Sequence, residues 1–283
     1  MMNLCIRFLR PLSPHSLLRR LKPYFSVFMM RFRIETQYRG AALGGIITQV
    51  FFGLMLIALY TTLYQSAPQT VPLAQTVTYV WLQQSCFRML LSTDSELMQT
   101  VRTGGMAYEM CRPLSPYGFY YTRAMAQKLV GSTLRAVPML LIAFLLPAPW
   151  GISLPAGVWQ LGMFLLALFM GLLCTCAMSN IAMAFTIRSL DNSGITSAMN
   201  LLLVTFCGNL LPLTLFPDKW QKFIRLTPYA QLLDAPIRIY TGEYTFMQSI
   251  ETIGIQVFWT CALIALGYFM WHRNQKHMIV QGG

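Results

Sequence analysis

Polar side chains inside long apolar runs are the first residues of this chain that could do chemistry. They are Gln49, Gln83, Gln84, Arg88, Lys128, Arg135, Asn180, Asn200 and Asn209. A charged side chain in apolar surroundings is costly, so it indicates function unless its charge reaches water. Arg88 and Lys128 lie near the ends of their runs and can extend outward. Arg135 lies deeper, about 10 Å in at 1.5 Å per residue.

The amide side chains have two interpretations. Amides within apolar helices form hydrogen bonds between helices about as readily as they contact a polar substrate. We therefore predict that Gln49, Gln83, Arg135 and Asn209 either line a pathway or join neighbouring helices. Arg135 is the residue of greatest interest, because its charge is the deepest.

Motifs of enzyme chemistry are missing from the sequence. It has no G-x-x-x-x-G-K-[ST] loop to cradle nucleotide phosphates, no H-E-x-x-H and no G-x-S-x-G. The histidines do not stand at ligand spacing, and the acids are nearly all in loops. Cys174 and Cys176 point to different faces of one apolar helix, which favours packing over metal binding. We expect no catalytic residue, no metal and no directly bound cofactor.

The elements that must position these side chains are apolar helices. Residues 41–63 contain no charge, and a helix of that length spans a bilayer core. Of the 283 residues, 55% are hydrophobic and only 11% are charged, far fewer charges than soluble domains carry. We predict an all-α polytopic membrane protein with six transmembrane helices, near 41–63, 71–92, 124–147, 157–185, 195–215 and 249–271.

Basic residues predict the orientation. Of the 21 Lys and Arg, eight precede residue 41: Arg7, Arg10, Arg19, Arg20, Lys22, Arg31, Arg33 and Arg39. Cytoplasmic loops carry such an excess, so both termini are expected in the cytoplasm and the protein in the inner (plasma) membrane. Four basic residues in 216–248 run against the rule. The net charge of +12 is better suited to anionic lipid headgroups than to nucleic acid.

Two domains follow from this pattern: a basic amphipathic segment over 1–40 and a six-helix transmembrane domain over 41–283. Residues 17–35 alternate apolar and basic side chains at helical spacing, which predicts an amphipathic helix on the inner leaflet, or two segments broken near Pro23. The first apolar run begins too late and is too long for a cleavable signal peptide.

A short cytoplasmic helix is predicted after the second span. Thr93 to Glu96 fit a capping box, and Gly104-Gly105 would end the helix after Arg102. Leu97 and Val101 give it an apolar face. This helix is either a docking element for a soluble partner or a tight surface connector.

The segment 211–245 carries prolines at 212, 217, 228 and 236. Asp218 can cap a short helix with Trp220, Phe223 and Ile224 on one side. An amphipathic helix with a tryptophan is typical of a membrane interface, and its apolar content suggests that it dips into the outer leaflet. Such a segment gates an exit path or acts as a simple lid.

The order of these pieces resembles the permease subunits of type-2 ABC exporters, six-span half transporters without their own ATPase domain. FRIETQYRGAALGG leads into the first span, VRTGGMAYEMCRPLSPYGFYY follows the second, and LPLTLFPDKWQKFIRLTPYAQLLDAPIRIYTGEYT precedes the last. The last piece is similar to the external re-entrant hairpin of that family. Arg135 matches no role in the family.

The resemblance implies two permeases, identical or paralogous, joined to two cytoplasmic ATPase subunits that use ATP and Mg. Residues 94–103 would be the coupling helix docked on the ATPase, with coupling carried by Glu96, Leu97, Val101 and Arg102. Phe216, Pro217, Trp220 and Pro228 would shape the external gate. The substrate would be amphiphilic: a drug, peptide or lipid-like molecule.

Two other functions remain open at this stage. The chain could be a membrane scaffold or assembly subunit that binds a partner and transports nothing. An intramembrane lipid-modifying enzyme is disfavoured, because the sequence offers no acid-base constellation. Whether the permease is a homodimer or heterodimer is open, although Gly40-x-x-x-Gly44 permits close helix approach and is weak evidence for a dimer face.

Overall fold

The computed structural model describes residues 14–37, 39–66, 71–90, 96, 99–100, 103, 105–112, 114–189, 193–208, 213 and 217–275. Within these ranges the chain is helical and contains no strand, which confirms the predicted all-α class. The helices are α2 (Pro14–Gln37), α3 (Arg39–Ser66), α4 (Leu73–Leu90), α6 (Met106–Met110), α7 (Pro116–Leu145), α8 (Val158–Ser189), α9 (Ser193–Phe206), α10 (Asp218–Leu226), α11 (Asp234–Thr241) and α12 (Phe246–Gln275).

Four of these helices are long and apolar enough to cross a membrane: α3, α7, α8 and α12. The protein is therefore membrane-embedded and polytopic. The helices at the other two predicted spans are shorter. α4 has 18 residues and includes the adjacent polar pair Gln83 and Gln84, and α9 has 14 residues. Six crossings thus stay a prediction.

Helix α8 is the centre of the bundle. It packs against α12, α11 and α7, while α3 and α4 pair with each other and with α7. Small buried residues let neighbours approach α8 closely. A side chain at Gly171 would press on the backbone of Leu232, in the turn before α11. Cys174 and Cys176 belong to different apolar clusters, as predicted from their spacing.

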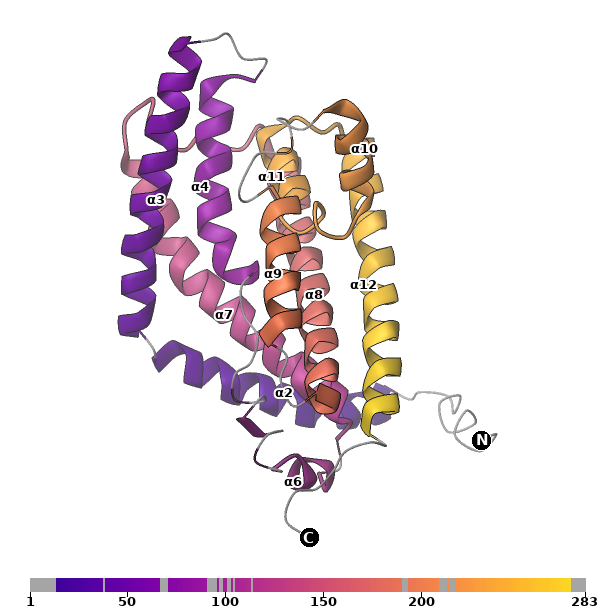
Figure 1. The fold of residues 1–283 in the computed structure, drawn as a ribbon. Coiled ribbons are helices and arrows are strands. Elements are labelled where there is room, and N and C mark those ends of the chain that lie inside the picture. Colours follow the sequence, from indigo (N-terminus) through magenta and orange to yellow (C-terminus); the bar gives the residue numbers. More distant parts are fainter. Residues whose placement is uncertain are drawn as a thin grey trace.

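Helix α2 lies across one end of the bundle, roughly perpendicular to the long helices (Figure 1). We call this the α2 end and the opposite one the far end. The helix is continuous through Pro23 rather than broken there. It packs mainly against α7. The Tyr24 hydroxyl lies 3.4 Å from the Ser115 hydroxyl, just before α7, and Val27 packs on the aromatic cluster that includes Trp271 of α12.

Helix α7 begins earlier than hydropathy indicates. The Ser115 hydroxyl accepts a hydrogen bond from the Gly118 amide, and Pro116 occupies the first turn, so the helix starts eight residues before the predicted span at 124. Arg123 and Lys128 interrupt the apolar pattern but not the helix. Lys128 does not extend outward as expected: it is buried, and its ammonium donates to the Met89 carbonyl at the end of α4 (3.3 Å).

Candidate functional site

A cluster of charged side chains joins three segments at the α2 end. Glu96 lies 3.1 Å from Arg31 of α2 and 2.5 Å from Arg123 of α7, and Arg31 also pairs with Glu35 at 3.2 Å. The Arg123 side chain is only 9% exposed, whereas that of Glu96 is 59% exposed. One carboxylate thus holds the segment after α4 to both α2 and α7.

Aromatic rings support this cluster from the bundle side. The Arg123 guanidinium lies over the rings of Phe119 and Tyr120, at 5.7 and 5.8 Å from their centroids. The Tyr120 hydroxyl donates a hydrogen bond to the Glu109 carboxylate of α6 (2.8 Å). The Tyr120 ring packs against the Trp271 ring of α12, with 5.5 Å between the ring centroids. A displacement of Glu96 would therefore be transmitted directly to α2, and through α7 to α6 and α12.

The residues predicted for coupling are only partly within the described structure. Glu96 is described, and it is helical, as are Gln99 and Thr100. The coupling helix over residues 94–103 stays a prediction. Leu97, Val101 and Arg102 lie outside the described residues. Sequence reasoning found Glu96 but missed its partners, because nothing in the chain marks Arg31 and Arg123 among its many basic residues.

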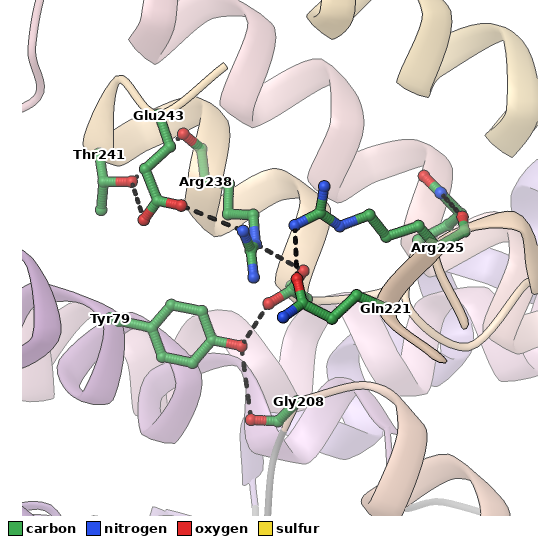
Figure 2. Close-up of polar contacts among 9 residues, drawn as sticks. Tyr79, Gly208, Gln221, Arg225, Arg238, Thr241 and Glu243 are labelled. Atoms are coloured by element: carbon green, nitrogen blue, oxygen red, sulfur yellow. Dashed lines mark hydrogen bonds and ion pairs between the residues drawn. The ribbon is translucent and has the colours of Figure 1, made fainter. Parts of the chain in front are cut away.

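A second polar network lies at the far end, and Figure 2 shows it around Tyr79, Arg238 and Glu243. The Tyr79 hydroxyl of α4 donates to the Asp234 carboxylate of α11 (2.9 Å). The Arg238 guanidinium bonds the other oxygen of Asp234 (2.8 Å) and the Glu243 carboxylate (3.2 Å). Asp234, Arg238 and Tyr79 are all buried, so the charges of Asp234 and Arg238 stabilise each other away from water.

The charged groups in this network shift one another's pKa values. Burial acts to lower the pKa of Arg238, but Asp234 and Glu243 outweigh it and hold that pKa above its ordinary value. Burial raises the pKa of the Glu243 carboxyl, and the charge of Arg238 opposes the shift. The guanidinium therefore stays charged at any physiological pH and fixes α11 in place.

The same network holds the end of α9. The Gly208 carbonyl accepts from the Tyr79 hydroxyl (3.4 Å) and from the Gln83 amide (3.2 Å), as Figure 2 shows for Tyr79. Gly208 has a φ of +82°, and a side chain there would overlap the Tyr79 hydroxyl. Only glycine fits this backbone without strain. Helix α4 thus fastens two separate segments, α9 and α11, at the far end.

The predicted gate residues are spread over the hairpin made by α10 and α11. Pro217 precedes α10 and is exposed, Trp220 faces away from the bundle, and Pro228 is half-buried in the turn after α10. Phe216 lies outside the described residues. The structure does not test whether these residues gate a path, so that role stays a prediction.

The polar residues singled out within apolar runs lie in different places. Gln49 is buried, and Gln83 belongs to the far-end network. Arg135 lies against the start of α3, where it donates to the Ala41 carbonyl (3.4 Å) and rests on Gly45, at which any side chain would overlap it. Asn209 lies outside the described residues. Arg135 and Gln83 thus join helices, which is one of the two interpretations offered above.

The far-end network was not predicted from the sequence, although part of it could have been recognised there. Asp234 and Arg238 stand four residues apart, the spacing of an ion pair on one helix face. Their third partner, Tyr79, is 155 residues away and carries no local signal. Among the described residues there is no group of three His, Cys, Asp or Glu side chains that could hold a metal.

Comparison with known families decides the class. A family model described as ABC-2 family transporter protein matches residues 46–279, which is most of the chain. The chain belongs to the ABC-2 transporter family. This confirms the resemblance drawn from the sequence and makes the protein a permease component of an ABC transporter. No curated protein gives a significant match.

Proposed function

We propose that this chain is the permease subunit of an ATP-driven exporter, and that separate cytoplasmic ATPase subunits hydrolyse ATP with Mg. Helices α4 and α9 complete six crossings, with both termini in the cytoplasm of a cell whose inner (plasma) membrane holds the protein. The permease pairs with a second copy or with a paralogue. Its substrate is amphiphilic, in keeping with the apolar character of the helices.

The observation that carries this proposal is the position of Glu96. It lies in the segment predicted to dock on the ATPase, and its carboxylate contacts α2 and α7 together. In this account the ATPase pushes on residues 94–103 when it closes on ATP. Glu96 transmits the displacement to Arg31 and Arg123. Because α2 runs into α3 after one residue, both α3 and α7 follow.

The far-end network supports the second half of the account. Tyr79 and Gln83 of α4 bond to Gly208 just after α9, and Tyr79 also bonds to Asp234 of α11. These bonds would keep that end closed. We propose that this is the resting, inward-facing state. A tilt of α4 or α8 pulls Tyr79 from Asp234 and opens the exit beside the hairpin.

The test changes Glu96 to Gln in the reconstituted complex with its ATPase. The amide keeps the size but loses the charge, so the contacts to Arg31 and Arg123 weaken. We expect the ATPase to copurify as before, while transport falls several-fold. The matched control is Glu251→Gln, an exposed carboxylate at the far end.

The alternative is a scaffold that binds the ATPase and transports nothing. It predicts no ATP-dependent movement of any amphiphile, in wild type or variant. If the Glu96 variant transports as well as wild type, the proposed transmission route is wrong, although the permease assignment stands.

A further inference from the structure

Helix α10 presents a large apolar face away from the bundle. Trp220, Phe223 and Leu226 recur at every third residue and are 60%, 64% and 62% exposed. Lys219 and Lys222 are exposed on the same half of the helix. Three large apolar side chains with two ammonium groups beside them form a face that water solvates poorly.

The adjoining side of α10, which carries Ile224 one turn after Trp220, is fixed to the protein. Ile224 is buried in a small cluster with Leu213 and Ala230. The Gln231 side chain donates to the Arg225 carbonyl, and the Trp259 indole of α12 donates to the Leu226 carbonyl at 2.8 Å. The helix therefore cannot turn Trp220 and Phe223 inward without losing these contacts.

The contact with Trp259 gives the depth of α10. Residues 252–271 of α12 contain no charge, and a run of this length matches the hydrocarbon core of a bilayer. Trp259 is eight residues beyond Glu251, about 12 Å inside that run at 1.5 Å per residue. In Figure 1 α10 lies beside the far part of α12. The contact from Trp259 to Leu226 therefore places the end of α10 at the depth of the lipid chains.

We propose that this face binds phospholipid of the far leaflet. Trp220, Phe223 and Leu226 contact acyl chains, and the ammonium groups of Lys219 and Lys222 extend along the helix to the lipid phosphates. Charge complementarity selects this occupant, because an apolar surface flanked by lysines matches an acyl chain that ends in a phosphate. Trp220 thereby anchors the hairpin in lipid, whether or not it also shapes a gate.

This inference needs only that α12 crosses the membrane, so it can fail while the permease proposal stands. The first test measures Trp220 fluorescence in the full chain reconstituted in phosphatidylcholine vesicles. Subtracting the spectrum of Trp220→Phe from that of wild type isolates its emission. We expect brominated acyl chains to quench this emission and aqueous iodide to leave it unchanged. The same subtraction with Trp81→Phe is the control, because Trp81 is buried in the bundle.

Two results would overturn the proposal. Quenching of Trp220 by iodide alone would show that the face meets water. Quenching by neither agent would show that protein, such as a second copy of this chain, covers it.

The second test concerns the lysines. Spin-labelled phosphatidylglycerol should associate with wild type more strongly than labelled phosphatidylcholine. We expect this preference to fall about fivefold for each lysine changed in Lys219→Gln/Lys222→Gln, since one ammonium at a membrane surface contributes about 1 kcal/mol. It should persist in Lys219→Arg/Lys222→Arg. Equal preference in both double variants would exclude the phosphate contacts.

Discussion

At the scale of single residues, the hydrogen bond from the Tyr79 hydroxyl to the Asp234 carboxylate joins α4 to α11 at the far end. Removing one hydrogen-bond donor from a buried carboxylate lowers the free energy of unfolding by about 1–3 kcal/mol. We expect Tyr79→Phe to lower the free energy of unfolding by about that amount, read as a drop in the thermal midpoint of the protein in detergent.

Tyr117→Phe is the matched control for that change. The Tyr117 hydroxyl is also buried, but among the described residues it has no hydrogen-bond partner. Its removal should leave the midpoint unchanged or raise it. Equal losses in both variants would mean that ring packing, not the bond to Asp234, is what Tyr79 contributes.

Residue-scale features were predictable from the sequence only where they are local. The four-residue spacing of Asp234 and Arg238 is a helix signal that could have been used. The partnership of Arg135 with Gly45 and Ala41 could not, because it joins two helices, and Arg135 and Ala41 are 94 residues apart in the chain. The estimated depth of Arg135 assumed an upright helix, whereas α7 runs obliquely across the bundle (Figure 1).

At the scale of elements, the contact between the segment at Glu96 and α7 can be measured by a double-mutant cycle. Glu96→Ala, Arg123→Ala and the double variant should give a coupling free energy of about 0.2–1 kcal/mol, modest because Glu96 is more than half exposed. The comparison pair is Glu109 and Arg112, 3.8 Å apart, where we expect less. Thermal unfolding supplies all four values.

A coupling free energy of zero between Glu96 and Arg123 would show that this ion pair does not hold the segment at Glu96 to α7. In that case Arg123 would be held by its aromatic neighbours and its other contacts, and Glu96 would join its segment to α2 but not to α7.

Element existence was largely predictable, because long uncharged runs leave a membrane helix few alternatives. The residues at which the helices begin and end were not predictable in the same way. Helix α7 starts at a Ser-Pro cap that hydropathy ignores, and two buried cations lie within it. The end of α11 has a local explanation in Gly242, whose φ of +79° closes the helix. Gly242 lies within the segment 211–245 that the sequence analysis compared with the external hairpin of the family.

At the scale of the whole molecule, the fold predicts that both termini face the same side. Val27 of α2 packs on the cluster that holds Trp271, near the end of α12, so these two helices meet at one end of the bundle. Reporter fusions should show both termini in the cytoplasm. Termini on opposite sides would require an odd number of crossings and would remove either α4 or α9 as a span.

At this scale the sequence could not predict that each end of the bundle has its own cluster of polar contacts. Charge patterning distinguishes inside from outside. It does not reveal that one ion cluster joins α2 to α7 while another closes α9 and α11 against α4. Both arise from contacts between distant segments, which only the packed helices create.

The central claim, a permease driven by a separate ATPase, is tested most directly by purifying the tagged protein in mild detergent. Bound proteins are identified and ATPase activity is assayed, beside a variant with Leu97→Asp and Val101→Asp. We predict that an ATPase copurifies with wild type and is lost from the variant, while the variant keeps its thermal midpoint. If no nucleotide-binding protein accompanies wild type in several detergents and in native lipid, the account is contradicted and the scaffold takes its place.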